Sequence, residues 1–179
     1  MGVISDTVMC TVRRNIRTKV TMTLLCTLTY CFHHLLGVGE GFAGDSDVLP
    51  HLTYTFLHTN VWHLFCNLLV LWSIRSRIES AGSFVIAFAA SWLPMYVVGP
   101  TVGLSGWLFA AFGIMWGRAG RLAECLRIGL PFIVLTMLLP NVNGTLHLYC
   151  YLIGFIYGVV AEILRKKINA HNIGYYLQG

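Results

Sequence analysis

The sequence predicts an all-α integral membrane protein, a six-transmembrane-helix bundle with its N- and C-termini both cytoplasmic. Three observations predict this fold: an apolar composition, apolar runs separated by turn residues, and basic residues confined to alternate loops. Hydrophobic residues make up 56% of the 179 positions and charged residues only 11%, whereas soluble domains carry about 25% charged residues. A soluble protein of this composition would expose large apolar patches and aggregate, so lipid is the expected solvent.

Six apolar runs divide the chain, and turn-favouring residues separate several of them. Pro100, Pro140 and the pair Asn143-Gly144 are the strongest turn signals. With about 20 residues per span, the chain has room for six helices and short loops. We therefore expect one membrane domain at residues 20–164, between cytoplasmic tails at 1–19 and 165–179. The runs are approximately 20–36, 61–74, 84–98, 104–116, 130–139 and 146–164.

The positions of Lys and Arg predict the orientation of the bundle. With six spans, all twelve fall in the two tails, the second-to-third loop and the fourth-to-fifth loop, which share one side of the membrane. The other side carries Glu40, Asp45 and Asp47 and no Lys or Arg. Positively charged loops stay on the cytoplasmic side. Both ends of this multi-pass protein are therefore predicted to be cytoplasmic, and the secretory pathway or plasma membrane is the favoured compartment. If the basic N-terminal stretch is a mitochondrial presequence, both ends lie on the matrix side of the inner membrane instead.

The same counts argue against other classes of protein. The net charge of +5 comes from four short basic clusters between apolar runs, a pattern typical of membrane loops and not of a nucleic-acid-binding surface. The six cysteines are scattered and form no CxxC pair, so they indicate neither a zinc site nor a disulfide framework. We expect no metal, no cofactor and no nucleic-acid partner.

Polar side chains gather where the even-numbered spans begin. His63 and Asn67 lie at the start of the second span, Ser105 at the start of the fourth and His147 at the start of the sixth, all on the predicted outer side. Polar groups at membrane depth are costly and usually face a bundle interior or a wet cavity. The fourth span is short, about 20 Å against a hydrocarbon core of about 30 Å, so Ser105 is expected below the outer surface in a water-filled depression.

Helical spacing predicts that two of these residues meet. His147, Gly154 and Gly158 lie at i, i+7 and i+11, within about 20° of one line along a helix, and the GxxxG spacing of the two glycines lets helix backbones approach closely. The fourth span carries a matching stripe of small residues beside Ser105: Gly106, Ala110, Gly113 and Gly117. If the two stripes pack together, the Ser105 hydroxyl and the His147 ring come into contact.

These residues together resemble the motifs of the rhomboid family of intramembrane serine proteases. Residues 103–106 (Gly-Leu-Ser-Gly) resemble its GxSG motif, and residues 58–67 resemble its His-x4-His-x3-Asn signature. His147 followed by glycines is similar to the sixth rhomboid helix. The resemblance covers roughly residues 48–162. It differs from the GxSxG elbow of soluble hydrolases because Trp107 occupies the last position.

The resemblance implies a rhomboid-like bundle that acts as a serine endopeptidase. Ser105 would be the nucleophile and His147 the general base of a dyad without an aspartate. His63, Asn67 and the Ser105 backbone N–H would form the oxyanion hole. The implied substrate is the single-span helix of a membrane-protein client, cut in or near the lipid bilayer on its outer side. The supporting residues would be Gly103, Gly106, Phe109, Gly154, Gly158 and His58.

The sequence departs from the family pattern in three places. Leu49-Pro50 stand where rhomboids commonly carry Trp-Arg in the first loop. Phe109 replaces the Tyr that often supports the catalytic histidine and keeps only its stacking surface. Cys150 stands where a glycine is usual, one helical turn before Gly154, so the packing of the sixth helix near the dyad has to accommodate a larger side chain.

Two other functions are compatible with parts of the sequence. A catalytically inactive rhomboid-like or derlin-like protein would bind or translocate membrane clients without cutting them, but such proteins usually lose the serine or histidine that Ser105 and His147 supply. A transporter or channel would carry polar residues along whole helices or paired broken helices, whereas here they occupy one end. A single Ser usually only bonds to a preceding carbonyl of its own helix, so the catalytic interpretation depends on the combination of residues. The glycosylation sequon at Asn143 lies too close to the bilayer for modification to be expected.

Overall fold

The computed structural model describes residues 2–37, 41–43, 47–76, 78–95, 100–139 and 141–176, with side chains described between residues 13 and 170 of these ranges. Regular structure in this part of the chain is helical, and its one isolated bridge pairs Phe42 with Thr101. The predicted all-α fold is therefore confirmed for the described residues. In chain order they form α1 (Gly2–Leu36), α2 (Val48–Thr53), the 3-10 turn η1 (Tyr54–Phe56), α3 (Val61–Ser73), α4 (Ser80–Ala90), α5 (Ser105–Ala119), α6 (Leu122–Glu124), the π-helical segment η2 (Cys125–Gly129), α7 (Leu130–Met137) and α8 (Gly144–Tyr176).

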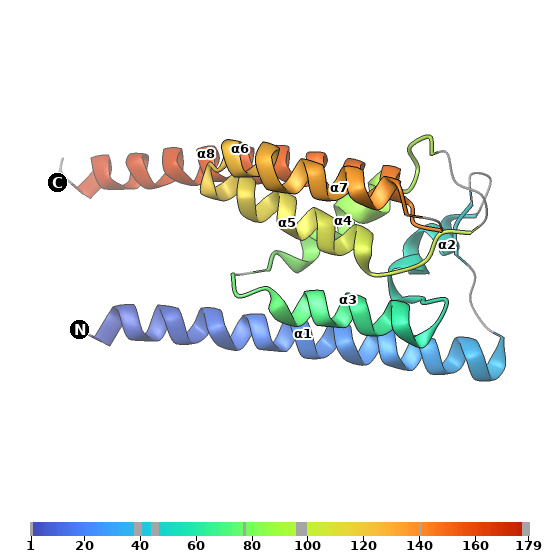
Figure 1. The fold of residues 1–179 in the computed structure, drawn as a ribbon. Coiled ribbons are helices and arrows are strands. Elements are labelled where there is room, and N and C mark those ends of the chain that lie inside the picture. Colours follow the sequence, from blue (N-terminus) through green and yellow to red (C-terminus); the bar gives the residue numbers. More distant parts are fainter. Residues whose placement is uncertain are drawn as a thin grey trace.

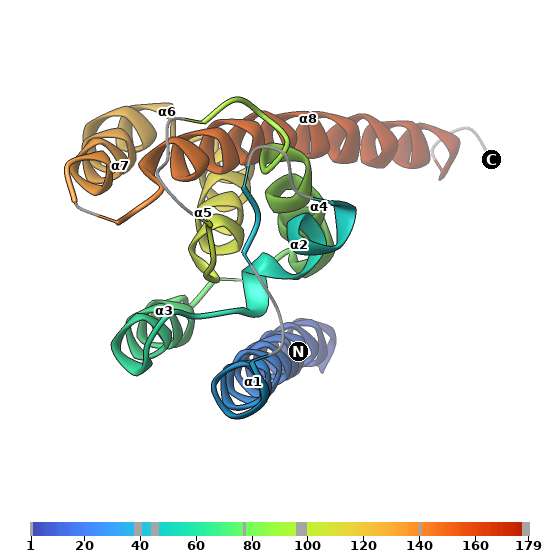
Figure 2. The same ribbon diagram turned by 90° about the vertical axis from the view of Figure 1, so that its right-hand side faces the viewer.

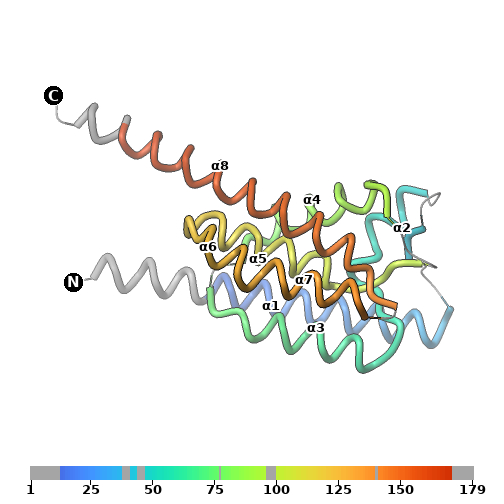
Figure 3. Tube along the Cα trace, turned by 45° about the horizontal axis from the view of Figure 1, so that its top comes forward, coloured from blue at the N-terminus to red at the C-terminus, as the bar shows by residue number. Residues whose placement is uncertain are grey.

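The helices lie in two groups, with α1, α3 and α5 roughly along one direction and α8 inclined to them (Figures 2 and 3). Helices α1 and α3 lie beside each other on one side of the molecule, and α4, α5, α7 and α8 lie on the other (Figures 1 and 2). Helices α3, α5 and α8 all begin at the end of the bundle opposite the two chain termini (Figure 1). This common end therefore brings together the helix starts at which the sequence concentrates its polar residues.

The contact between α5 and α8 is the most extensive one in the bundle, and small residues permit it. A Cβ atom added at Gly113 would overlap the Tyr151 carbonyl oxygen, and one added at Gly154 would lie 2.5 Å from the Ala110 carbonyl oxygen. Gly117 and Gly158 face the partner helix backbone in the same way. The two small-residue stripes thus lie face to face, and α5 is the buried centre of the fold.

Helix α1 is held to α3 by a buried lysine. Lys19 is 7% exposed, and its Nζ donates hydrogen bonds to the carbonyl oxygens of Trp72 at 3.0 Å and Ile74 at 2.6 Å. These carbonyls lie at the C-terminal end of α3, where helix carbonyls lack intrahelical partners and a positive charge is favoured. Lys19 therefore caps α3, although the sequence pattern assigned it only to the basic cluster of the N-terminal tail.

The surface of the bundle suits a lipid environment. Large apolar side chains such as Leu24, Phe32, Trp62 and Leu138 are more than half exposed, and soluble proteins rarely expose so much apolar surface. By length and composition, one segment among the described helices is able to cross a bilayer, Gly144–Ala170 within α8, while Val61–Ser73 and Ser80–Ala90 are shorter apolar helices. The count of six spans and the cytoplasmic placement of the termini stay predictions.

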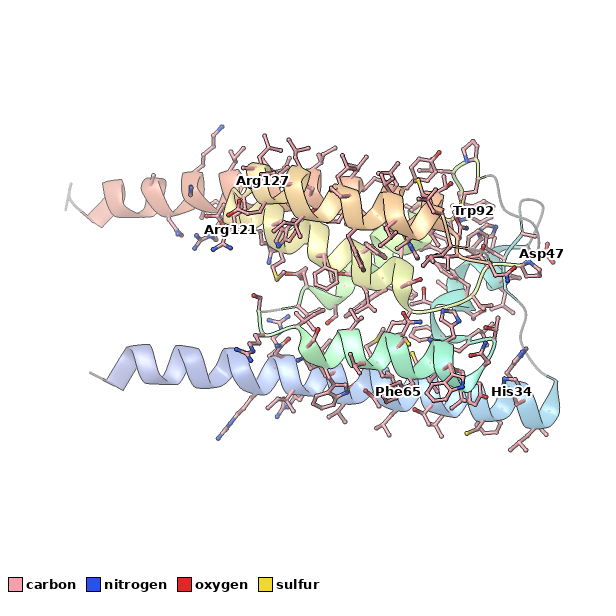
Figure 4. The ribbon with its side chains drawn as sticks, viewed as in Figure 1. His34, Asp47, Phe65, Trp92, Arg121 and Arg127 are labelled. Carbon is pink, nitrogen blue, oxygen red and sulfur yellow. The ribbon has the colours of Figure 1, made fainter. Side chains whose placement is uncertain are left out.

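The charged residues labelled in Figure 4 lie towards opposite ends of the bundle. Arg121 and Arg127 lie towards the end that holds the chain termini, and Asp47 lies at the opposite end (Figure 4). Glu40, Asp45 and Arg77, which entered the same topology prediction, lie outside the described residues. These labelled positions are compatible with the predicted orientation, which stays a prediction.

The helices pass through the predicted domain boundaries without a break. Helix α1 runs from Gly2 through the predicted tail at 1–19 into the first apolar run, and α8 continues beyond residue 164. The later part of α8 extends past α5 at the end where the chain terminates (Figure 3). The division into tails and membrane domain therefore corresponds to no change of secondary structure, and its boundaries stay predictions.

Candidate active site

The structure brings the side chains of Ser105 and His147 into contact. Ser105 is the first residue of α5, and His147 lies in the first turn of α8. Ser105 Oγ lies 2.8 Å from His147 Nε2, a hydrogen-bonding distance. The His147 ring is 5% exposed, and Ser105 is half-buried. A hydroxyl and an imidazole in this arrangement can act chemically as a nucleophile and its base.

Two side chains join the segments that lead into α5 and α8. Asn143 Oδ1 accepts from the backbone N–H of Leu146 at 2.9 Å and so caps the start of α8. Asn143 Nδ2 donates to Thr101 Oγ1 at 2.9 Å, and the Thr101 backbone pairs with Phe42. The sequence pattern indicated Asn143 only as part of a turn and of a glycosylation sequon, although an Asn just before a helical run is also an N-cap signal. The sequon's Nδ2 is engaged and the residue is 8% exposed, so a glycan does not fit there.

The His147 ring is held on two further sides. Phe109 of α5 stacks on it with ring centroids 4.3 Å apart and an interplanar angle of 25°. Thr136 of α7 places its Oγ1 3.1 Å from His147 Nδ1. The sequence pattern indicated Phe109 but not Thr136, because a lone Thr in an apolar run carries no positional signal.

His63 and Asn67 line the approach to Ser105 from α3. Asn60 caps α3 by accepting from the His63 backbone N–H at 2.9 Å. A Cβ added at Gly103, whose φ is +125°, would lie 2.7 Å from His63 Nε2 and 3.6 Å from Asn67 Nδ2. Both side chains therefore lie against the backbone just before Ser105, and only a glycine permits that approach.

The amide of Asn67 has an unused donor. Asn67 is 7% exposed, and its Nδ2 has no hydrogen-bond partner among the described residues. Leaving a buried donor unpaired costs about 1–3 kcal/mol, so such a group in a native structure calls for an explanation, and a catalytic role is one of them. The arrangement provides a donor beside Ser105 that is available to an incoming acceptor.

The remaining expected residues support these side chains. His58 is 1% exposed, places its Nδ1 3.2 Å from the Phe56 carbonyl oxygen and has its ring 5.1 Å from that of His63. A Cβ at Gly106 would lie 2.9 Å from the Tyr54 hydroxyl and 3.5 Å from Cys150 Sγ. Cys150 is accordingly accommodated beside Gly106 at the α5–α8 contact. Gly154 and Gly158 face α5, as described above.

A second Ser–His contact lies between α2 and the end of α4 and differs in its chemistry. His51 Nδ1 lies 2.8 Å from Ser91 Oγ, and the His51 ring stacks between Phe42 and Trp92. Ser91 Oγ donates to the Phe88 carbonyl oxygen at 2.6 Å, so the hydroxyl accepts from His51 and its proton is already engaged. Leu49 of the same helix α2 is exposed. This pair joins α2 to the end of α4 and is a packing contact.

Comparison with models of known protein families shows which family the chain belongs to. The family model described as Rhomboid domain matches residues 45–167. This match spans more than half of the chain, so the protein belongs to the rhomboid family. The family consists of membrane proteins, generally intramembrane serine proteases, that act on membrane-protein substrates within the bilayer. No curated protein matches the chain.

Proposed function

We propose that this protein is an intramembrane serine endopeptidase that cleaves transmembrane segments of its substrates with a Ser105–His147 dyad. The observation that carries the proposal is the 2.8 Å contact between Ser105 Oγ and His147 Nε2. The contact occurs at the start of two helices whose close packing holds their ends in register. Unlike Ser91, Ser105 has no described carbonyl acceptor for its hydroxyl, so its proton is available to His147.

The reaction follows from the positions of these groups. Ser105 Oγ attacks the scissile carbonyl carbon while its proton passes to His147 Nε2, and the carbonyl oxygen takes up the electron pair as an oxyanion. When the intermediate collapses, the C–N bond breaks and the leaving amine receives the proton from Nε2. Water then attacks the acyl-enzyme by the same route and releases the second product.

The oxyanion is stabilised by donors on two helices. The Ser105 backbone N–H lies at the N-terminus of α5, where N–H groups lack helical partners and the helix dipole is positive. His63 and the unpaired Nδ2 of Asn67 approach the same place from α3. Donors held in place before the reaction stabilise the developing charge without reorganisation.

The expected substrate is a single-span client helix in the bilayer. A peptide bond inside a transmembrane helix is protected because its N–H and C=O groups are hydrogen-bonded within the helix. Cleavage therefore requires local unwinding, which agrees with the family preference for small residues before the cut and helix-weakening residues after it. With six spans and both ends cytoplasmic, the cut is on the outer side, in the secretory pathway or plasma membrane in preference to the mitochondrial inner membrane. No metal or cofactor takes part.

Labelling with a serine-reactive fluorophosphonate tests the proposal. The purified protein in detergent or proteoliposomes is compared with Ser105→Ala, His147→Ala and the control Ser73→Ala, whose exposed hydroxyl bonds to the Val70 carbonyl. We expect labelling and client cleavage in the wild type and Ser73→Ala, and loss of both in Ser105→Ala and His147→Ala. Labelling that survives both dyad substitutions would exclude the dyad. A folded wild type that is neither labelled nor active would place the protein among the inactive rhomboid-like or derlin-like proteins, which bind clients without cutting them. The one sequence feature that favours this alternative is Leu49-Pro50 in place of the family's Trp-Arg.

A further inference from the structure

The hydroxyl of Thr136 lies between two hydrogen-bond partners beside the dyad. Its Oγ1 donates to the Ile133 carbonyl oxygen at 2.7 Å and lies 3.1 Å from His147 Nδ1. Thr136 is 8% exposed and His147 is 5% exposed, so water competes little for either group. Thr136 belongs to α7, a helix that contributes neither dyad residue.

The single proton of this hydroxyl defines the direction of both bonds. When Thr136 donates to the Ile133 carbonyl, its oxygen has only lone pairs to offer His147. Nδ1 must then carry a proton and donate it to Thr136 Oγ1. The other ring nitrogen, Nε2, is left with its lone pair directed at Ser105 Oγ, 2.8 Å away. This is the tautomer in which a neutral histidine accepts the serine proton.

The opposite tautomer fits the surroundings less well. It would place the proton on Nε2, facing the hydroxyl that has to be deprotonated, and would require Thr136 to give up its shorter bond to Ile133. The imidazolium formed during the reaction carries protons on both nitrogens, so it also needs an acceptor at Nδ1. Because Thr136 donates to the Ile133 carbonyl, its oxygen can accept from Nδ1 in the neutral histidine and also in the imidazolium.

We infer that Thr136 is a positioning residue that sets the tautomer and orientation of His147, in the place that a carboxylate occupies in a Ser-His-Asp triad. In the described part of the chain, the side-chain hydrogen bonds of His147 go to Ser105 and Thr136, and neither partner is a carboxylate. The inference rests on the proposed protease function. In this arrangement three helices contribute to catalysis. Helix α5 carries the nucleophile, α8 carries the base, and α7 carries the group that orients the base.

Paired substitutions at position 136 test this role. Thr136→Val keeps the shape of the side chain and removes the hydroxyl, whereas Thr136→Ser keeps the hydroxyl and removes a methyl group. Thr53→Val is the matched control, because Thr53 also donates to a preceding carbonyl of its own helix, that of Leu49 at 2.9 Å. For each variant we would measure the fluorophosphonate labelling rate, kcat and KM for a single-span client in proteoliposomes, and the melting temperature.

The outcomes separate this inference from the proposed function. We expect Thr136→Val to lower kcat and the labelling rate by about 10- to 100-fold with KM unchanged, less than the factor of about 10⁴ seen when the charged Asp of a triad is replaced. Thr136→Ser should restore most of the rate, and Thr53→Val should behave as wild type. A folded Thr136→Val with the wild-type rate would overturn the inference and leave the dyad standing. Equal loss in the Val and Ser variants would also overturn it, because the role would then be packing. A wild type without labelling would instead overturn the protease proposal itself.

Discussion

The side-chain amide of Asn143 donates a hydrogen bond of 2.9 Å to the hydroxyl of Thr101, and this bond joins the segments that lead into the two dyad helices. On one side, Asn143 caps α8 three residues before Leu146. On the other, Thr101 pairs with Phe42, and the Gly103 backbone N–H donates to the Tyr54 carbonyl oxygen at 2.9 Å. The relative positions of Ser105 and His147 therefore depend on contacts between the segments that precede α5 and α8, as well as on the contact between the two helices themselves.

The first prediction concerns this link. Asn143→Ala should lower stability by about 0.5–2 kcal/mol through loss of the helix cap and should also slow labelling of Ser105, because the start of α8 is no longer tied to Thr101. Thr101→Val removes only the acceptor and should have the smaller effect. Denaturation and labelling of both single variants and the double variant would give a coupling energy of about 0.5–3 kcal/mol, as expected for residues in contact. Strictly additive effects would show that the two side chains do not act together.

The second prediction concerns the unpaired amide of Asn67. Asn67→Ala should lower kcat by about 10²–10³, the usual cost of removing one oxyanion donor, with little change in melting temperature because its Nδ2 has no described partner to lose. The loss should be smaller than that of Ser105→Ala.

Asn60→Ala is the matched control for this variant. It removes the cap of α3 and should cost about 0.5–2 kcal/mol of stability while it retains most of the activity. Full activity in Asn67→Ala would remove this residue from the oxyanion hole.

The third prediction concerns the backbone before the nucleophile. Gly103→Ala combines an unfavourable φ of +125° with a Cβ placed 2.7 Å from the His63 ring, so it should abolish cleavage. Gly120→Ala imposes a similar constraint, with φ at +66°, but its Cβ would meet nothing within 4 Å. Gly120→Ala should lose about 1–2 kcal/mol from the left-handed backbone and Gly103→Ala more, because its φ lies outside that region; activity measured per folded molecule should fall only in Gly103→Ala. Equal activity in the two variants would contradict the close approach of His63 to the nucleophile loop.

The fourth prediction concerns the contact between α5 and α8. Gly113→Ala would push a methyl group into the Tyr151 carbonyl and should cost about 1–3 kcal/mol, as overpacking usually does. The labelling rate of Ser105 should fall with it, because the two helices are forced apart.

Gly82→Ala provides the comparison within another helix. Its Cβ would lie 3.2 Å from the Glu79 side chain and 3.3 Å from the Tyr157 ring, so small side-chain shifts should offset part of the gain of about 0.5–1 kcal/mol of alanine over glycine in a helix. Thermal unfolding should therefore change much less in Gly82→Ala than in Gly113→Ala, whose added Cβ meets backbone atoms that cannot shift. A Gly113→Ala protein as stable as the wild type would mean that the helices are packed less closely than described.

Several features of the site were accessible from spacing alone because they depend on helical periodicity. Ser105 and His147 lie at the ends of two small-residue stripes, and residues on one face of a helix can be counted from the sequence. The unoccupied donor of Asn67 was not accessible, because a hydrogen-bond partner depends on what surrounds the group. Lys19 illustrates the same limit, since its charge suggested a solvated tail and only the positions of the Trp72 and Ile74 carbonyls make it a buried cap.

By itself, the sequence determined that the described part of this protein is helical, that its surface suits lipid and that it belongs to the rhomboid family, because composition, periodicity and motif spacing are local properties of the chain. Only the tertiary structure decided which of two Ser–His contacts has a free hydroxyl proton, and which neighbour orients the histidine. Those answers depend on where the Phe88 and Ile133 carbonyls lie relative to Ser91 and Thr136. A hydrogen bond requires both partners within about 3 Å in a suitable direction, and no pattern along one helix specifies the position of a group on another.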